Sequence, residues 1–265
     1  MNDGVRVAFA LWPHDAPGAL LAGADVLVFS ASLRGAGDEI ARALGVLSII
    51  ERERHEHYEN RDVARRFALG RLHLREILGA LLGVHPAMVP IQIGLHGKPA
   101  LARAAQPSGL RFSVAHCEEL LLVAVTTLGE VGIDAERVRP IERWARVADR
   151  VFNPTERAAM GREIANGEEP SSVFFRFWCR GEAELKAIGS GISGLGAHRD
   201  GWHPAGLHVM EIASVPLPPD LAGEEARYQA AVALCAPRDA SAFRTPTETT
   251  QARPPRITPT SASTA

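Results

Sequence analysis

The chain has 265 residues, of which 46% are hydrophobic and 23% are charged, and its formal net charge at pH 7 is −2. This composition is typical of a soluble globular protein, and the length suits one large domain or two small ones. The small net charge gives no electrostatic reason to expect binding to nucleic acid or to an anionic membrane. No apolar run approaches the ~20 residues that span a bilayer.

The cysteines and the N-terminus indicate a reducing compartment. Cys117, Cys179 and Cys235 are far apart in the sequence, and an odd count without a CxxC pair is a poor framework for disulfides or zinc. We therefore expect buried or half-buried free thiols. The segment MNDGVRVAFALWPHD has one arginine, only a short apolar stretch and early acidic residues, so it predicts a first strand rather than a signal peptide. Together these features predict a cytoplasmic protein.

The first part of the chain predicts two strands followed by two helices. VRVAFALW and ADVLVFSAS are typical of short strands, and Ser48 and Glu51 have the spacing of a capping box at the start of a charged helix. From Arg61 to Leu82, apolar residues recur at helical spacing, which predicts a long helix packed on one side. Gly83 is a suitable residue to end it. A strand at VPIQIG and a loop at LHGKPALA follow.

The second part predicts more strands around two helices. RFSVAH indicates a strand, and the two apolar runs of ELLLVAVTTLGEVGIDAERV flank a turn at Gly129, which favours a hairpin. In RVFNPTERAAM, Asn153 can cap a helix, Pro154 can take its first position and Glu156 its third. Another helix follows near Trp178, and GLHVMEIASV and ARYQAAVALCA predict the last strands.

This order of elements predicts an α+β protein made of two similar α+β subdomains. We expect an N-terminal subdomain at residues 1–110 and a C-terminal one at 111–235. The remaining segment, 236–265, is rich in Pro, Thr and Ser and poor in apolar residues, so it cannot bury enough surface to offset its ordering entropy. We expect this tail to be disordered.

Two carboxylates at the end of the GEVGIDAER strand are the first candidates for chemistry. Asp134 and Glu136 are two residues apart, so a strand places both on one face. Neighbouring carboxylates repel each other unless a cation lies between them, and Mg²⁺ binds such oxygen ligands together with water and phosphates. Glu182 can supply a third carboxylate. The alternative is a solvated strand end that faces Arg137 and Arg139.

Basic groups elsewhere suit an anionic substrate, although each has an ordinary structural interpretation. His116 ends an apolar strand, where it is either a structural hydrogen-bonding group or a ligand. Lys98 lies in the sequence HGKP, which either presents an ammonium group to an anion or forms a simple turn. Arg66 and Arg71 are five residues apart on the long helix and do not share one stripe. Basic groups together with carboxylates are the mixture expected around a polyphosphate held through Mg²⁺.

The segment WCRGEAELKAIGSG carries a charged face and an unusual glycine. Glu182 and Lys186 are four residues apart and therefore project from one side of the predicted helix. Gly181 precedes Glu182 inside that helix, where a glycine costs about 1 kcal/mol relative to alanine.

The order of these motifs resembles the 4′-phosphopantetheinyl transferases of the surfactin-synthetase-activating type. The resemblance extends from about Leu47 to Gly191 and includes LSIIERER, RRFALGR, HGKP, FSVAH, VGIDAER, FNPTERAAM and WCRGEAELKAIGSG. The last three, in this order and spacing, are specific, whereas HGKP alone is not. The family's fold implies a pseudo-twofold pair of α+β subdomains with the active site in the cleft between them.

The resemblance also implies a reaction and its partners. The enzyme is expected to transfer 4′-phosphopantetheine from coenzyme A to a serine of an acyl or peptidyl carrier protein, with Mg²⁺, and to release adenosine 3′,5′-bisphosphate. It implies a monomer that activates carrier proteins for secondary-metabolite biosynthesis. Which carrier protein, which pathway and whether acyl-coenzyme A is accepted stay open.

Roles transfer from the family residue by residue. Asp134, Glu136 and Glu182 match the Mg²⁺ ligands, and Glu182 is also the expected base, so that Glu182, Lys186 and Asp134 form the catalytic set. Lys186 matches the lysine that contacts the pyrophosphate of coenzyme A. The other expected coenzyme A ligands are Ser113 and His116 at its phosphates, Lys98 near the adenosine end and Arg66 at the 3′-phosphate.

The chain departs from the family at one position. The family motif W-x-x-K-E-A has a lysine where this chain has Gly181. Arg180 can supply the missing charge, the lysine can be dispensable, or the protein can be a weakened or inactive member. We favour an active enzyme because the other motif residues are present. The runner-up is a non-catalytic module that binds coenzyme A or a carrier protein, and a weaker option is an unrelated Mg²⁺-dependent phosphohydrolase.

Overall fold

The computed structural model describes residues 5–15, 23–94, 96–102, 108–190, 206–224 and 227–235. Its α-helices are α2 (Asp38–Val46), α3 (Ile49–Glu56), α4 (Arg61–Leu82), α5 (Trp144–Val151), α6 (Pro154–Ala165) and α7 (Pro170–Ile188). Its strands are β1 (Val7–Leu11), β2 (Val26–Ser32), β3 (Ile91–Ile93), β4 (Pro99–Leu101), β5 (Arg111–Cys117), β6 (Leu120–Thr126), β7 (Glu130–Arg137), β8 (Leu207–Ile212) and β9 (Tyr228–Cys235). Two 3₁₀ turns cover Pro86–Met88 and Pro219–Leu221. The predicted α+β class is confirmed.

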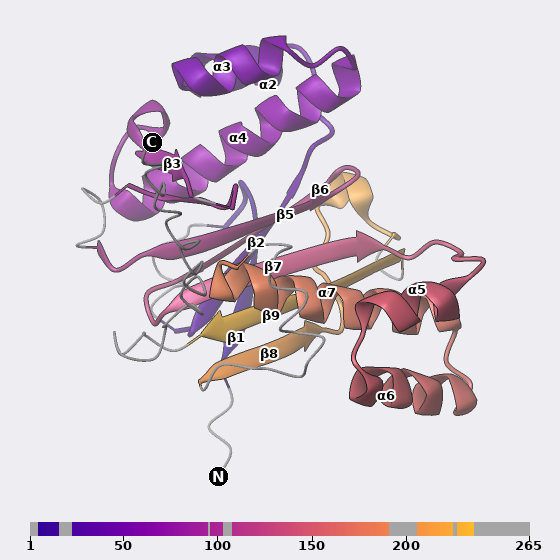
Figure 1. Ribbon diagram of the computed structural model, residues 1–265. Coiled ribbons are helices and arrows are strands. Elements are labelled where there is room, and N and C mark those ends of the chain that lie inside the picture. Colours follow the sequence, from indigo (N-terminus) through magenta and orange to yellow (C-terminus); the bar gives the residue numbers. More distant parts are fainter. Residues whose placement is uncertain are drawn as a thin grey trace, which may run out of the picture.

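Two sheets lie between helices (Figure 1). The first sheet has the order β1-β2-β6-β5 and the second the order β7-β9-β8, while β3 and β4 form a separate pair. One face of the first sheet packs on α4, through Leu27, Phe29 and Val123 against Leu72 and other residues of the helix. Its other face packs on the second sheet. The small side chains of α7 then cover the far face of β9, so the core has the layer order helix, sheet, sheet, helix.

The strand β7 leaves the first sheet and enters the second, so the predicted hairpin around Gly129 is wrong. The strand β6 pairs with β2 on one side and with β5 on the other, and both of its edges are therefore occupied. Because no edge of β6 is left, β7 pairs with β9 instead. The hairpin that does form joins β5 to β6 through Glu118 and Glu119, and Glu118 has a φ of 52°.

The starts of α3 and α6 and the end of α4 agree with the sequence signals. Ser48 and Glu51 form a capping box at α3, and Asn153 and Glu156 form another at α6, with proline in its first turn. Gly83 ends α4 in the left-handed conformation. The helix α7 begins at Pro170, eight residues before the predicted start at Trp178, because Glu169 caps it by accepting hydrogen bonds from the first-turn amides.

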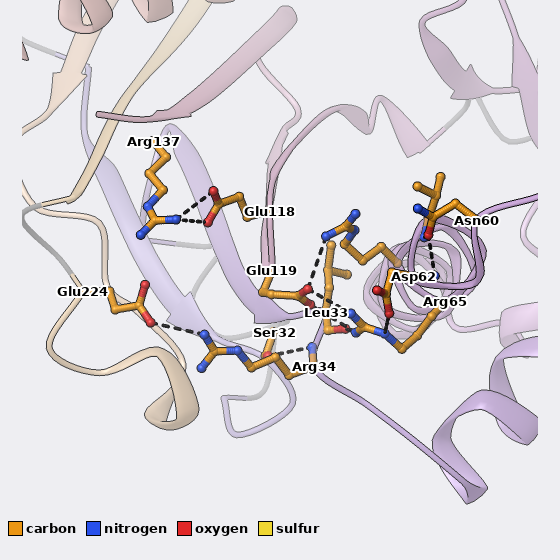
Figure 2. A network of polar contacts seen from close by, with 12 residues as sticks. Ser32, Leu33, Arg34, Asn60, Asp62, Arg65, Glu118, Glu119, Arg137 and Glu224 are labelled. Atoms are coloured by element: carbon orange, nitrogen blue, oxygen red, sulfur yellow. Dashed lines mark hydrogen bonds and ion pairs between the residues drawn. The ribbon is translucent and has the colours of Figure 1, made fainter. Parts of the chain in front are cut away.

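A network of ion pairs joins α4 to the β5–β6 hairpin and to the second sheet (Figure 2). Glu119 accepts hydrogen bonds from Arg65 on α4, and Glu118 accepts two from Arg137 at the end of β7. Arg34, which follows β2, binds Glu224 near the C-terminal strand. Two adjacent glutamates of one turn therefore hold elements from both parts of the chain.

The structure also bears on the predictions for the cysteines, the subdomain boundary, the tail and membrane-spanning segments. All three cysteines are buried and free, as predicted. The predicted boundary between residues 110 and 111 stays a prediction, and the four-stranded sheet takes two strands from each side of it. The tail at 236–265 lies outside the described residues. Within the described part of the chain, every helix is too short or too polar to cross a membrane.

Candidate active site

One cavity brings together seven of the eight residues that the sequence singled out. It has a volume of about 380 Å³ and is lined by Lys98, Ser113, His116, Asp134, Glu136, Glu182 and Lys186, among others. These residues come from the loop before β4, from β5, from β7 and from α7. Segments up to 88 residues apart in the chain therefore meet at the edge where the two sheets approach each other.

Lys186 and Asp134 form an ion pair in the wall of this cavity. The Nζ atom of Lys186 lies 2.8 Å from Oδ1 of Asp134 and 3.0 Å from the carbonyl oxygen of Ile133. Asp134 is only 8% exposed, and its other oxygen, Oδ2, is buried without a hydrogen-bond partner among the described residues. One oxygen of this carboxylate is thus held by an ammonium group, while the other is left to accept a further positive group.

Ser113 and Lys98 bind backbone groups of β7 along the edge that does not pair with β9. The hydroxyl of Ser113 accepts a hydrogen bond of 3.2 Å from the amide of Ile133. The ammonium group of Lys98 donates to the carbonyl oxygen of Val131 at 2.8 Å and to that of Lys186 at 2.6 Å. Both side chains line the cavity, and the Nζ atom of Lys98 also lies 3.8 Å from a carboxylate oxygen of Glu130.

Glu136 lies beside Asp134 at the cavity wall and pairs with Arg139 at 3.1 Å. Arg137, the other arginine near this strand end, binds Glu118 instead. Glu182 faces the same cavity from α7. Within the described ranges, no three His, Cys, Asp or Glu side chains are close enough together to hold a metal ion by themselves.

His116 lies at the junction of this cavity and a larger one. Its side chain is partly open to solvent, yet the cavity walls desolvate the imidazole, and Lys186 and Arg66 lie near it. Desolvation first, and then these positive charges, lower the pKa of His116 below its ordinary value. A neutral imidazole can either donate to or accept from a phosphate group.

Arg66 lines the larger cavity, which has a volume of about 650 Å³ and shares His116 and Glu136 with the first. Arg54 of α3 and Arg71 of α4 line the same cavity. Arg66 and Arg71, which are five residues apart on α4, therefore converge on one cavity although they do not share one stripe of the helix. Glu119 lies 3.3 Å from the guanidinium group of Arg66.

Sequence reasoning missed the aromatic wall of this larger cavity. Tyr58 and Phe67 lie with ring centroids 5.4 Å apart, and Arg54 lies 5.2 Å from the Phe67 ring. The spacing of Arg54 and Tyr58, four residues apart across the end of α3, was the one local signal that they point together. Their meeting with Phe67 depends on how α3 packs on α4.

Arg180 does not replace the lysine that is missing at Gly181. Its guanidinium group lies 2.9 Å from Glu211 on β8 and 5.5 Å from the Phe177 ring, outside the set of residues that line the cavity. Gly181 itself is buried within α7. The structure therefore does not support the interpretation that Arg180 supplies the missing positive charge.

Comparison with known proteins identifies related chains. Residues 130–228 match the family model described as the 4′-phosphopantetheinyl transferase superfamily. The chain is 33% identical over 208 residues to the 4′-phosphopantetheinyl transferase HetI of Nostoc sp., which covers 78% of this chain and 82% of HetI. It is 35% identical to AcpT of Salmonella typhimurium over 43% of this chain and 56% of AcpT. It is 26% identical to the 4′-phosphopantetheinyl transferase of Bacillus subtilis over 60% of this chain and 66% of that protein.

The match to HetI extends over most of both chains, and the superfamily match contains β7 and α7, which carry Asp134, Glu136, Glu182 and Lys186. The chain therefore belongs to the 4′-phosphopantetheinyl transferase superfamily and is an enzyme of that class.

Proposed function

We propose that this enzyme transfers 4′-phosphopantetheine from coenzyme A to a serine of an acyl or peptidyl carrier protein, with Mg²⁺, and releases adenosine 3′,5′-bisphosphate. The observation that carries the proposal is the gathering of Lys98, Ser113, His116, Asp134, Glu136, Glu182 and Lys186 around one cavity. The adjoining cavity, with its three arginines, is large and positive enough for the phosphorylated nucleotide end of coenzyme A. We also propose that the enzyme acts as a cytoplasmic monomer.

In the proposed reaction, the serine oxygen forms a bond to the phosphorus that carries the pantetheine arm. The bond from that phosphorus to the bridging pyrophosphate oxygen breaks, and adenosine 3′,5′-bisphosphate leaves with the electron pair. Glu182 is the proposed acceptor of the serine proton, directly or through one water. The ammonium group of Lys186, fixed by Asp134, is positioned to bind a pyrophosphate oxygen while it keeps its carboxylate partner.

The residues proposed to hold Mg²⁺ are Asp134, Glu136 and Glu182. The buried Oδ2 atom of Asp134, which has no hydrogen-bond partner within the described part of the chain, suits a carboxylate oxygen that binds a cation. Mg²⁺ generally takes one or two carboxylates and completes its shell with water and substrate phosphates, so a closed cluster of three is not required. When bound, the ion would offset negative charge on the pyrophosphate.

The intact mass of an apo-carrier protein, measured after incubation with the enzyme, coenzyme A and Mg²⁺, tests this proposal. We expect a gain of one phosphopantetheine group that is lost when a chelator is added or when Asp134 is replaced by Asn. Coenzyme A binding without any mass gain on several different carriers would favour the non-catalytic module instead. The comparisons do not support that alternative.

Two substitutions at Gly181 measure what a lysine at this position would contribute to the reaction. Gly181→Lys restores the family's charge, and Gly181→Ala is the matched control, because it improves helix propensity by about 1 kcal/mol without adding charge. An added cation near a phosphate contributes about 1–3 kcal/mol. We therefore expect the lysine variant to raise kcat/KM about tenfold over the alanine variant, in the same mass-based assay run as a time course. Equal rates in the two variants would show that this lysine is dispensable.

A further inference from the structure

Lys98 and Lys186 occupy equivalent places on one edge of β7. The second sheet has the order β7-β9-β8, so β7 is an edge strand and pairs by its backbone only with β9 among the described strands. The carbonyl groups of Val131 and Ile133 are two residues apart and therefore point to the same side. Lys98 donates to the first of them and Lys186 to the second.

Lys98 also binds the helix that carries Lys186. Its Nζ atom lies 2.6 Å from the carbonyl oxygen of Lys186 itself, in the last turn of α7. The last four carbonyl groups of a helix have no partner inside the helix, and a cation at this end also interacts favourably with the helix dipole. Lys98 therefore ties the C-terminal turn of α7 to β7.

The charge of Lys98 is balanced within the protein. Two of its three N–H donors are used by the carbonyl groups of Val131 and Lys186, and Glu130 lies 3.8 Å from its Nζ atom. Arg111 binds the same carboxylate at 3.2 Å. Backbone carbonyl groups of β7 and α7 hold the ammonium group of Lys98, whereas Arg66 and Arg71, which line the larger cavity, pair with the carboxylates of Glu119 and Glu51.

The composition of the chain agrees with a special role for the ammonium group. Lys98 and Lys186 are the only lysines in the sequence, and the other 27 of its 29 basic residues are arginines. A lysine carries three rotatable donors on a flexible stem, whereas the guanidinium group of arginine is a rigid planar fork that matches carboxylates and phosphates. Each of the two lysines donates a hydrogen bond to a backbone carbonyl group of β7.

We propose that Lys98 is a positioning residue, which holds the end of α7 against β7 and so keeps Lys186 beside Asp134. This inference rests on the proposed function, and it replaces direct contact with coenzyme A as the main role of the Lys98 side chain. A shift of about 1 Å in a reacting group can cost about 100-fold in rate. The effect of losing Lys98 should therefore fall on kcat rather than on coenzyme A binding.

Steady-state kinetics of Lys98→Met and Lys98→Arg test the proposal, with coenzyme A and with 3′-dephospho-coenzyme A as substrates. We expect both variants to lower kcat about 10- to 100-fold, to leave KM for coenzyme A within about twofold and to keep the preference for coenzyme A over the dephospho form. Arg66→Met is the matched control, and it should raise KM and weaken that preference. If Lys98→Arg keeps full activity while Lys98→Met raises KM, Lys98 is a phosphate ligand and the proposal is wrong.

Hydrogen exchange of the substrate-free protein separates this inference from the proposed function. We expect faster exchange of the α7 amides at residues 185–189 in Lys98→Met than in the unchanged protein, with the amides of α4 unaffected. This readout needs no transferase activity, so it remains decisive if no carrier protein is modified. Unchanged exchange at the end of α7 would overturn the proposal, and general acceleration would mean that Lys98 supports the whole fold rather than this turn.

Discussion

At the scale of single residues, Gly132 decides how closely α7 approaches β7. A Cβ atom at this position would lie 1.9 Å from the carbonyl oxygen of Ala183 and 2.5 Å from the amide nitrogen of Ala187. Only glycine lets a helix and a strand come this near. The neighbouring residues Ile133 and Asp134 then lie within reach of Lys186.

Replacing Gly132 by Ala should move α7 away from β7. Because the obstructing atoms are backbone atoms, we expect a loss of about 1–3 kcal/mol in unfolding free energy and a melting temperature lower by about 3–10 °C. The kcat of the transferase should fall with it, since Lys186 is drawn off Asp134. Gly161→Ala in α6 is the matched control, because its Cβ would meet no atom within 4 Å and should be neutral or stabilising. Similar melting temperatures in both variants would contradict this account of Gly132.

At the scale of the elements, a buried ion pair fixes α3 on α4. Glu51 completes the capping box of α3 and also accepts two hydrogen bonds from Arg75 of α4, at 2.9 and 2.7 Å. Arg75 donates further to the carbonyl groups of Pro86 and Val89 and is 2% exposed. One carboxylate therefore sets the position of the helices that carry Arg54 and Arg66.

Replacing Glu51 by Gln should destabilise the protein in a way that depends on pH. Burial alone would raise the pKa of Glu51, but the Ser48 amide and the Arg75 guanidinium group outweigh it, so the pKa lies below its ordinary value of 4.5. A lowered folded-state pKa stabilises the fold above about pH 4.5, and this stability is lost as the pH falls through the folded-state value. We expect Glu51→Gln to cost about 3 kcal/mol at pH 7 in urea unfolding and less at pH 4. The exposed Glu53 on the same helix provides the control, and an equal cost at both pH values would argue against the ion pair.

At the level of the whole protein, the net charge is only −2, but three arginines lie together around one cavity. Arg54, Arg66 and Arg71 converge on the larger cavity, which adjoins the carboxylates of the smaller one. The two glutamates of the β5–β6 turn hold this arrangement by binding Arg65 and Arg66 on one side and Arg137 on the other (Figure 2).

Coenzyme A binding should therefore weaken as ionic strength rises. Arg54 lies at the exposed edge of the larger cavity, where salt screens charge over about 10 Å at 0.1 M. We expect the Kd measured by calorimetry to rise severalfold between about 0.05 and 0.5 M salt, and to rise less steeply in Arg54→Met. Arg162→Met, on the exposed side of α6, should keep the full salt dependence. A Kd that does not respond to salt would speak against nucleotide phosphates in this cavity.

The sequence alone was enough to predict the starts of α3 and α6, the end of α4 and the α+β class, while the family resemblance supplied the set of residues around the smaller cavity. Capping boxes, a C-terminal glycine and residues two or four positions apart involve atoms within one turn or one strand, so local spacing is enough to predict them. The specific order of VGIDAER, FNPTERAAM and WCRGEAELKAIGSG identified the family in the same local way.

The packing of the other strands determines which edge of β7 is paired and which groups meet at its free edge. β6 already has a neighbour on each side, and this fact, which no local pattern encodes, sends β7 to the other sheet. The edge of β7 that is left without a strand neighbour is bound by Ser113, Lys98 and Lys186, and Lys98 bonds to a residue 88 positions away. The physical reason is that strand pairing and hydrogen bonding across a sheet edge depend on which partners are left after the other elements have packed.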